Sequence, residues 1–400
     1  MFKLLVTSII IINNLLPPVS PTCRYPFEGF GVHLGKLESF NETSADVRAS
    51  IINLVYNDLL IRNFRTEYLP QFSTKENTYS INCSDVKSCA WITMHSLLSK
   101  LPDKSVIVSI WSPPYYMKTF FRHLATEYEE AYYYYITNVT QLIKDQFNLT
   151  IDRISMANEP ENLIASWDEC TMPANQLCRL AQTYDDPIIS LCPENAWFSV
   201  SKIYLNYSYH GINCRRACRT VVSHGYTLSL NPLFWGSVYY DTKEYPEDVE
   251  SPTWITEISS TRILAQYSQM TEAIDFSTSI INFVGITCVQ RFYYWLAFTT
   301  FPSGESLIWY DVTRNKIVLP KKYYALRHFT MASFDNSGHR FICSTNSYLC
   351  LQFTSKTVYV NKGYDKEQIN NLCDLCCTTD DHDYRCTASN VLPPRSICSC

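Results

Sequence analysis

The sequence predicts a closed barrel of eight parallel β-strands with helices between them, the (β/α)8 or TIM-barrel fold. Short segments rich in apolar or β-branched residues alternate with longer helix-like segments, which is typical of strand–helix units around a parallel sheet. The 400 residues exceed the about 250 that such a barrel needs, so a small appendage also fits. Two glutamates, Glu159 and Glu257, each follow an apolar strand-like segment, where barrels place functional residues.

The strands and helices of the barrel can be assigned in chain order. The longer helix-like segments include Glu127–Phe147, which contains a run of four tyrosines, and Arg262–Phe276, which precedes the eighth strand. We expect the eight strands at Phe30–Leu34, Asp58–Phe64, Ser105–Ile110, Ile151–Ala157, Ile188–Cys192, Thr220–Ser223, Thr253–Thr256 and Arg291–Trp295.

Beyond the eighth strand the sequence predicts a smaller unit. A loop from Ala297 to Ser306 leads to a strand at Leu307–Tyr310 and a helix near Lys321–Ser333. The final segment is polar and cysteine-rich without periodicity, which predicts a disulfide-tied tail with no core of its own. We therefore expect the barrel over residues 24–335, a small, reduced β-appendage over 336–365 and the tail over 366–400, with appendage strands at Arg340–Cys343, Tyr348–Phe353 and Thr357–Val360.

The amino-terminal segment has the pattern of a secretory signal peptide. Lys3 precedes the apolar run Leu4–Ile12, which is too short to span a bilayer. No other apolar run reaches the about 18 residues of a membrane span. We expect a signal peptide over residues 1–20, cleaved between residues 18 and 23, and a secreted protein without a membrane anchor. A lysosome-like compartment is the alternative location.

Composition limits the partners of the protein. The net charge is −5 and charged residues make up 18% of the chain, against a typical share of about 25%. This leaves no basic surface for nucleic acid or for anionic lipid. The chain has 29 Tyr, 20 Phe and 8 Trp, and aromatic faces suit sugar rings, although most of these side chains belong to the core. We expect no nucleic-acid partner, no cofactor, no metal and a monomer.

The cysteines indicate an oxidising compartment. The chain has 17 of them, so at least one is unpaired or bonded to another chain. Zinc is the alternative for Cys373 and Cys376, but disulfides are favoured in a secreted chain, and we expect the tail cysteines to pair mostly among themselves. Five N-x-S/T sequons, at Asn41, Asn82, Asn138, Asn148 and Asn206, agree with a glycoprotein. The expected local pairs are Cys83–Cys89, Cys170–Cys178, Cys214–Cys218 and Cys343–Cys350.

Two glutamates stand where the fourth and seventh strands end. The segment from Ile154 to Pro160 reads as a half-apolar strand running into Asn158, Glu159 and a proline, which ends strand pairing because it lacks an N–H. The segment from Pro252 to Ser259 delivers Glu257 in the same way. In a barrel of this kind both carboxylates face each other across the mouth.

A pair of carboxyl groups across a cleft is what glycosidic cleavage requires. One must be protonated to assist the leaving oxygen, and the other must be ionised to attack the anomeric carbon. Mutual repulsion and burial drive the two pKa values apart. Either glutamate alone is more simply read as a surface carboxylate, but strand context at both positions favours a catalytic pair. Glu161 competes with Glu159, but it falls beyond the proline in the loop.

At these residues the chain resembles glycoside hydrolase family 30, in the clan of retaining β-glycosidases with a barrel fold. The resemblance implies the same barrel, no cofactor, and activity on β-linked glycans. It covers roughly residues 25 to 345 in the family's order. The segments that carry it are Phe27–Gly31, Ile110–Thr119, Ala157–Glu161, His224–Tyr226, Trp254–Glu257, Tyr294–Trp295 and Tyr323–Phe329.

The resemblance also implies roles for individual residues. Glu159 would be the acid/base and Glu257 the nucleophile, while Asn158 would hydrogen-bond the 2-hydroxyl of the sugar. Arg62, at the end of the second strand, would lie near Glu257 and keep it ionised, with Arg65 as the alternative. The remaining expected substrate-binding residues are Trp111, Tyr226 and Trp295, which would line the sugar subsite, and His224, which a buried core histidine would explain equally well.

The sequence departs from the family in places that bear on specificity. Gly31 is followed by Val32-His33-Leu34 rather than by another small residue, and the β-appendage is reduced. The segment Thr66–Ser88 and the loop Ala297–Ser306 match no subfamily. The resemblance therefore predicts the fold and the reaction better than it predicts the substrate.

The leading hypothesis is a secreted retaining hydrolase of a β-linked polysaccharide, either xylan-type or β-1,6-glucan-like. A glucosylceramidase acting on glycolipid is an alternative, for which Tyr115, Phe120, Phe121 and Phe298 offer an apolar rim. A catalytically inactive carbohydrate-binding barrel is the other, and the presence of both glutamates argues against it.

Overall fold

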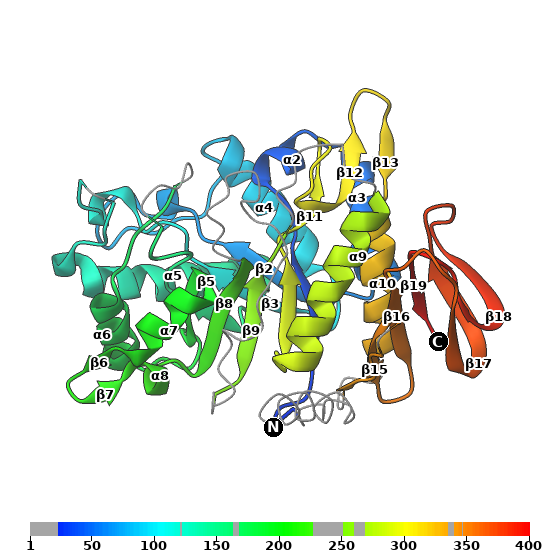
Figure 1. Cartoon of the computed structure of the whole chain (residues 1–400). Helices are drawn as coiled ribbons and strands as arrows, with labels where there is room; N and C mark the ends of the chain where they lie inside the picture. Colours follow the sequence, from blue (N-terminus) through cyan, green and yellow to red (C-terminus); the bar gives the residue numbers. More distant parts are fainter. Residues whose placement is uncertain are drawn as a thin grey trace, which may run out of the picture.

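The computed structural model describes residues 23–120, 122–162, 168–226, 251–259, 269–334, 340–345 and 347–400. Eight parallel strands close into a barrel in the order β1-β10-β9-β8-β5-β4-β3-β2, and helices surround it (Figure 1). This confirms the (β/α)8 barrel. The expected signal peptide at residues 1–20 lies outside the described residues. Among the described residues, no helix is both long and apolar enough to cross a bilayer.

Six of the eight barrel strands lie close to their expected positions, while the second and the fifth are displaced towards the carboxyl end, since the fifth was expected at Ile188–Cys192 and spans Leu191–Trp197. The apolar run Leu59–Ile61, which the sequence suggested as strand, instead closes a turn in which Leu60 is left-handed with φ 53°. Leu59 and Ile61 are buried there, which explains their apolar character. The barrel strands are β1 (Gly29–His33), β2 (Asn63–Glu67), β3 (Ser105–Ser109), β4 (Arg153–Ser155), β5 (Leu191–Trp197), β8 (Thr220–Tyr226), β9 (Thr253–Glu257) and β10 (Arg291–Tyr294).

The helices follow the expected alternation. Ser44 caps one helix by accepting from the Val47 amide, and Asp85 caps another by accepting from the Ser88 amide at 2.9 Å. The helix expected at Lys321–Ser333 has those bounds. The helices are α2 (Leu37–Asn41), α3 (Ala45–Asn53), α4 (Val86–Ser99), α5 (Glu129–Phe147), α6 (Ala174–Tyr184), α7 (Phe198–Asn206), α8 (Cys214–Ala217), α9 (Gln269–Ile280) and α10 (Lys321–Ser333), with π-helical turns η1 (Leu54–Asp58) and η7 (Ile281–Ile286) extending α3 and α9.

The tyrosine run in α5 divides between core and surface. Tyr132 and Tyr135 are buried, whereas Tyr134 is 45% exposed, as helical spacing requires. The Tyr132 hydroxyl donates to the carbonyl oxygen of Met156, which lies just beyond β4. The helix therefore supports the segment that carries Glu159.

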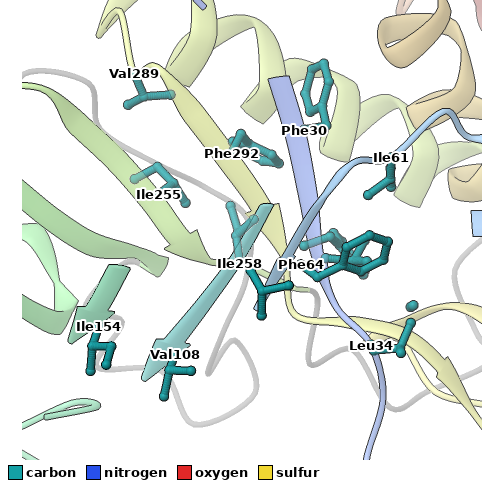
Figure 2. Packing of buried hydrophobic residues seen from close by; sticks show 14 of the residues in the cluster. Phe30, Leu34, Ile61, Phe64, Val108, Ile154, Ile255, Ile258, Val289 and Phe292 are labelled. Carbon is teal, nitrogen blue, oxygen red and sulfur yellow. The ribbon is translucent and has the colours of Figure 1, made fainter. Parts of the chain in front are cut away.

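The core has two layers, one outside and one inside the barrel. On the outside, apolar side chains such as Phe30, Ile255 and Phe292 project from neighbouring strands towards the helices (Figure 2). On the inside, one side chain from each of five strands forms a second apolar cluster. It consists of Ile107, Leu191, Val222, Trp254 and Tyr293.

The inner cluster requires a glycine on β1. A Cβ added to Gly31 would lie 2.3 Å from Cδ1 of Tyr293, so only glycine lets that ring fill the barrel. This packing forms the apolar floor beneath the barrel mouth.

The carboxyl-terminal segment is more ordered than the sequence suggested. It does not form a coreless tail, because its strands join those of the appendage in one six-stranded sheet in the order β14-β15-β16-β19-β17-β18. Leu375, Leu392 and Cys398 belong to a separate buried cluster within this sheet. The strands are β14 (Arg340–Ile342), β15 (Leu349–Phe353), β16 (Thr357–Asn361), β17 (Glu367–Thr378), β18 (Arg385–Leu392) and β19 (Ser396–Ser399). A further sheet joins β11 (Leu296–Thr299), β12 (Ser306–Asp311) and β13 (Lys316–Val318), and β6 (Ser208–Tyr209) pairs with β7 (Ile212–Asn213).

Two of the four expected local disulfides form, and two do not. The pairs Cys83–Cys89 and Cys343–Cys350 are confirmed. The tail cysteines pair among themselves as Cys373–Cys400, Cys376–Cys386 and Cys377–Cys398, which removes the zinc alternative.

The expected pairs Cys170–Cys178 and Cys214–Cys218 are wrong. Cys218 bonds Cys192 instead, because it follows α8 and faces β5, and Cys23 bonds Cys288. Cys170, Cys178 and Cys214 remain buried thiols.

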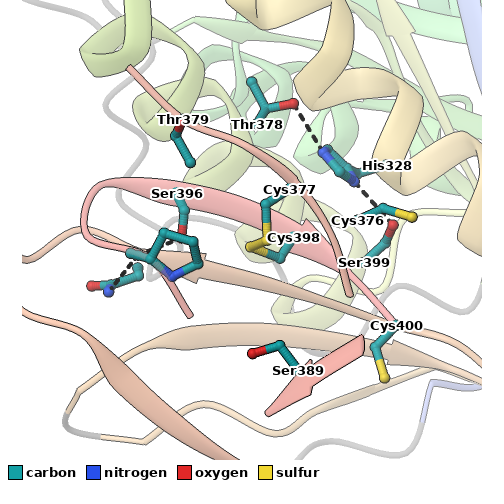
Figure 3. The surroundings of a disulfide bond; sticks show 12 residues. His328, Cys376, Cys377, Thr378, Thr379, Ser389, Ser396, Cys398, Ser399 and Cys400 are labelled. Atoms are coloured by element: carbon teal, nitrogen blue, oxygen red, sulfur yellow. Dashed lines mark hydrogen bonds between the residues drawn. A yellow bond between two sulfur atoms is a disulfide. The ribbon is translucent and has the colours of Figure 1, made fainter. Parts of the chain in front are cut away.

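His328 joins the barrel to the six-stranded sheet. Its ring projects from α10, with Nδ1 3.0 Å from the Ser399 hydroxyl and Nε2 3.1 Å from the Thr378 hydroxyl, beside the Cys377–Cys398 bridge (Figure 3). Burial lowers the pKa of His328 to about 3, so the ring is neutral and each nitrogen serves one hydroxyl.

His328→Ala should lower the free energy of unfolding by about 2–4 kcal/mol, because it leaves two buried hydroxyl groups without this partner. Chemical denaturation measures the change. The control is His382→Ala, an exposed histidine in the turn between β17 and β18, which should change stability by less than about 0.5 kcal/mol. Equal effects of the two substitutions would contradict the joining role of His328.

Candidate active site

Glu159 and Glu257 lie together at the mouth of the barrel. Glu257 is the last residue of β9, and Glu159 follows β4 in a left-handed conformation with φ 46°. They are 7% and 6% exposed. One carboxylate oxygen of each lies within 4.8 Å of the other and of a His224 ring nitrogen. The structure therefore brings together the two carboxylates that the motifs singled out.

A buried arginine connects the two strand ends, but it is Arg65 and not Arg62. Its Nη1 donates to Oε2 of Glu257 at 2.7 Å, its Nη2 donates to Oδ1 of Asn158 at 2.6 Å, and its Nε donates to the Ser109 hydroxyl at 2.9 Å. The side chain of Arg65 is 1% exposed. Such a buried guanidinium is stable only because acceptors surround its donors.

The expectation that Arg62 lies near Glu257 is wrong. Arg62 precedes β2 and stacks on the ring of Tyr56, with Cζ 3.6 Å from the ring centroid. The error follows from the displaced second strand. Because β2 begins at Asn63, Arg65 lies on this strand and Arg62 lies before it.

His224 contacts the carboxylates rather than only packing in the core. Its Nδ1 lies 3.0 Å from Oε1 of Glu159, and its Nε2 lies 3.8 Å from both Glu194 and Glu257. Burial alone would lower the pKa of His224, but the surrounding carboxylates outweigh it and raise the pKa to about 10. The imidazole is therefore protonated at neutral pH. The Tyr226 hydroxyl, on the same strand, donates to Oε1 of Glu257 at 2.9 Å.

Three rings lie together on one side of the mouth. The rings of Trp111 and Trp295 stack with centroids 5.1 Å apart, and the His33 ring stacks on Trp295 at 4.7 Å. Both nitrogens of His33 are buried without a hydrogen-bond partner in the described part of the chain. Burial and the nearby Arg65 charge hold the pKa of His33 well below its usual value. Its position was noted in the sequence only as a departure from the family pattern.

Glu194 is a third carboxylate of the cluster, and sequence reasoning missed it. It is fully buried on β5, accepts from the Ser109 hydroxyl at 2.7 Å and lies 3.3 Å from Nη2 of Arg65. Burial alone would raise its pKa, but Arg65 and His224 lower it to about 2. The expected fifth strand ended at Cys192, so Glu194 fell outside it.

Glu161, the competing carboxylate, points elsewhere. It accepts from Nδ2 of Asn195 at 2.7 Å and from the Ala196 amide at 2.8 Å, on the strand that follows. Burial raises the pKa of Glu161 to about 7. Its role is to anchor the loop after β4.

The two central carboxyl groups differ in their partners. Burial raises the pKa of Glu257, although the charges of His224 and Arg65 counteract it. For Glu159 burial acts in the same direction, but the hydrogen bond from His224 outweighs it and lowers the pKa. The Glu159–His224 pair thus shares one proton, held mainly on the imidazole.

Glu159, His224 and Glu257 are also the one group in the described ranges whose ligand atoms are close enough to hold a metal ion. A metal ligand must be a neutral imidazole, whereas three carboxylates keep His224 protonated. The residues present therefore fit a proton-binding site better than a metal site.

No protein-family model matches the chain, and no curated protein sequence matches it. Solved structures with the same fold include a glycoside hydrolase family 30 endoxylanase from Clostridium papyrosolvens C71, with 16% identity, a TM-score of 0.68, and coverage of 94% of this chain and 97% of that one. The catalytic domain of family 30 xylanase C from Talaromyces cellulolyticus has 14% identity and a TM-score of 0.70, with 95% and 98% covered. The endo-β1,6-glucanase BT3312 has 14% identity and a TM-score of 0.69, with 96% and 93% covered.

These similarities confirm the expected resemblance at the level of the fold. The alignments cover more than nine-tenths of the chain, so they include the six-stranded sheet as well as the barrel. Identities of this size establish fold rather than activity.

Arg65→Gln should lower the free energy of unfolding by about 3–5 kcal/mol, because breaking a buried ion pair leaves the charges of Glu257 and Glu194 uncompensated. Arg62→Gln is the matched control, since it removes a half-buried guanidinium that stacks on Tyr56 outside the charge cluster, and it should cost about 1 kcal/mol. Denaturant titration of both variants tests this assignment. If Arg62→Gln were the more damaging substitution, Arg65 would not hold the cluster together.

Proposed function

We propose that this protein is a secreted retaining β-glycoside hydrolase, with Glu159 as acid/base and Glu257 as nucleophile. The observation that carries the proposal is that one oxygen of each carboxylate lies within 4.8 Å of the other, at the ends of the fourth and seventh barrel strands. Retaining glycosidases place these groups about 5–5.5 Å apart, whereas inverting enzymes need about 6.5–9.5 Å to admit a water molecule.

The first chemical step transfers the sugar to the protein. An oxygen of Glu257 attacks the anomeric carbon while Glu159 donates its proton to the glycosidic oxygen, so the C–O bond breaks and the leaving group departs neutral. Burial raises the pKa of Glu257, but Arg65 and Tyr226 donate to it and counteract burial, which favours the ionised carboxylate that this attack needs. In the free protein the proton lies mainly on His224, and it reaches Glu159 through the 3.0 Å contact between them.

The second step releases the sugar. Glu159, now ionised, takes a proton from water, whose oxygen attacks the anomeric carbon and breaks the ester to Glu257. Two inversions give a product with the original β configuration. His224 stabilises Glu159 in both of its protonation states, since it can give or accept the shared proton.

Neighbouring residues supply sugar contacts. Oδ1 of Asn158 accepts from Arg65, which orients its Nδ2 as a donor for the 2-hydroxyl of the bound sugar. Trp111, Trp295 and Tyr226 lie beside the carboxylates and line the subsite for the attacked sugar. Contacts of this kind strengthen in the transition state and accelerate the reaction.

A β-linked polysaccharide, either xylan-type or β-1,6-glucan-like, is the proposed substrate class. Structural similarity to two xylanases and an endo-β1,6-glucanase supports it. The seven disulfides are consistent with secretion, because such bonds persist in oxidising compartments.

A glycolipid substrate has weaker support. Tyr115 and Phe120 are 54% and 94% exposed, but Phe298 is buried against Phe40 and cannot form an apolar rim. Phe121 lies outside the described residues. Hydrolysis assays with xylan, glucuronoxylan, β-1,6-glucan and glucosylceramide distinguish the substrates, and aryl β-glycosides distinguish an enzyme from an inactive binding barrel.

The stereochemical outcome tests both carboxylates. NMR of the first product should show the β configuration. Glu257→Ala should abolish turnover, and azide should restore it with an inverted product, because a small anion fills the space of the lost carboxylate. Glu159→Ala should slow substrates with poor leaving groups by about 10²–10⁴-fold. It should spare aryl glycosides whose leaving groups need no protonation. An inverted product from the wild type would remove the retaining assignment.

Trp111→Ala and Trp295→Ala should each reduce kcat/KM by orders of magnitude while the protein stays folded, since both rings lie at the mouth. Trp91→Ala is the comparison, because Trp91 is fully buried in α4 and its loss should cost about 3–5 kcal/mol of stability. Circular dichroism melting and aryl-glycoside kinetics separate the effects. A mouth variant that unfolds as readily as Trp91→Ala would mark that tryptophan as core.

A further inference from the structure

Five charged side chains meet beneath the barrel mouth, and one of them has no part in the proposed chemistry. Glu159, Glu194 and Glu257 are carboxylates, while Arg65 and the protonated His224 are cations. All five are at least nine-tenths buried. The carboxylates of Glu159 and Glu257 would touch the sugar, whereas Glu194 lies deeper and is fully buried.

We propose that Glu194 is a positioning residue that acts through His224 and Arg65. Its fixed negative charge holds the shared proton on the Glu159–His224 pair and keeps Arg65 in place between the strands. This inference rests on the proposed function, because it concerns the same site.

The contacts of Glu194 connect it to both cations of the cluster and to Glu159. Its Oε1 accepts from Ser109 at 2.7 Å, lies 3.3 Å from Nη2 of Arg65, and lies 3.8 Å from Nε2 of His224. Its backbone carbonyl accepts the amide N–H of Glu159 at 3.1 Å. One residue therefore touches both cations of the cluster and holds the backbone of the proposed acid.

The second oxygen of Glu194 shows that charge matters here, and not hydrogen bonding alone. Oε2 is buried and has no hydrogen-bond partner in the part of the chain that the structure describes. A buried acceptor without a partner destabilises a protein, and a buried charge does so unless cations offset it. A glutamine would satisfy Ser109 and Arg65 equally well, so the advantage of a carboxylate is its charge.

The charged and titratable groups that face Glu194 come from several strands. Arg65 faces it from β2 and His224 from β8, while the backbone of Glu159 approaches from the loop after β4. Glu257, on β9, contacts the same two cations. His33 on β1 interacts with Arg65 and stays neutral, because burial and that charge lower its pKa. The hydroxyls of Ser109 and Ser155 complete the surroundings.

Glu194→Gln removes the charge and keeps the shape, so it tests the proposal directly. Without the negative charge of Glu194 the protonated form of His224 is less stable, so the Glu159–His224 pair loses its proton at lower pH. Arg65 is then paired with one carboxylate fewer, so its charge favours the ionised form of Glu257 more strongly and the pKa of Glu257 falls as well. Both limbs of the pH profile of kcat/KM should therefore move to lower pH by at least about 1 unit. KM should change by less than about 3-fold, because Glu194 does not touch the sugar.

Two further variants separate charge from folding. Glu194→Asp keeps the charge and should keep both limbs within about 0.5 unit of the wild type. Glu169→Gln is the matched control, because Glu169 is also a buried carboxylate paired with an arginine, Arg122, at 3.0 Å. It should leave the pH profile unchanged. An unshifted profile in Glu194→Gln would overturn the proposal.

A measurement that needs no activity distinguishes this inference from the proposed function. ¹⁵N NMR of the imidazoles, with His224 assigned through His224→Asn, should show His224 protonated at pH 8 in the wild type. In Glu194→Gln it should lose its proton at least about 1 pH unit lower than in the wild type. A neutral His224 at pH 8 in the wild type would overturn the proposal even if the variant does not fold. Failure of the wild type to hydrolyse any β-glycoside would refute the proposed function alone.

Discussion

The arrangement of the mouth depends on the buried guanidinium of Arg65. Its donors reach Ser109, Asn158, Glu194 and Glu257, which lie on or just beyond β3, β4, β5 and β9. A planar group with fixed donor directions constrains each of those strand ends at once. The geometry of the two proposed catalytic groups follows from this, because Glu257 binds Arg65 directly and the backbone of Glu159 is held by Glu194.

The apolar floor of the barrel makes these charges interact strongly. Ile107 and Val222 form part of the inner cluster, and the residues two positions further along the same strands are Ser109 and His224. The change from apolar to polar therefore occurs within one step of the strand period. The charged side chains at that level are buried, so neighbouring charges set the pKa of each group.

The periodicity of the sequence predicts the barrel. It does not predict which residues point into the barrel where a strand has a bulge. The register between β8 and β9 shifts so that His224 pairs with Glu257 after Ser223 pairs with Ile255. A similar shift surrounds Glu194, whose φ is 58°. A bulge adds one residue and reverses the facing of those that follow. Glu257 was found because its motif was distinctive, whereas Glu194 had no such motif and followed a strand that was expected to end early.

The same reasoning explains the misplaced arginine and cysteines. Leu59 and Ile61 are apolar because they pack under a turn, and hydrophobicity alone cannot distinguish a buried turn from a strand. Cys214 and Cys218 are close in sequence, yet a partner four residues away on one helical turn competes poorly with a strand that packs across it, here through Cys192. Local spacing predicts a contact only where the chain folds back on itself, as it does between Cys343, just after β14, and Cys350 on the adjacent strand β15. A buried charge cluster is the opposite case, because each of its members comes from a different strand. Its side chains come into contact only when the barrel closes.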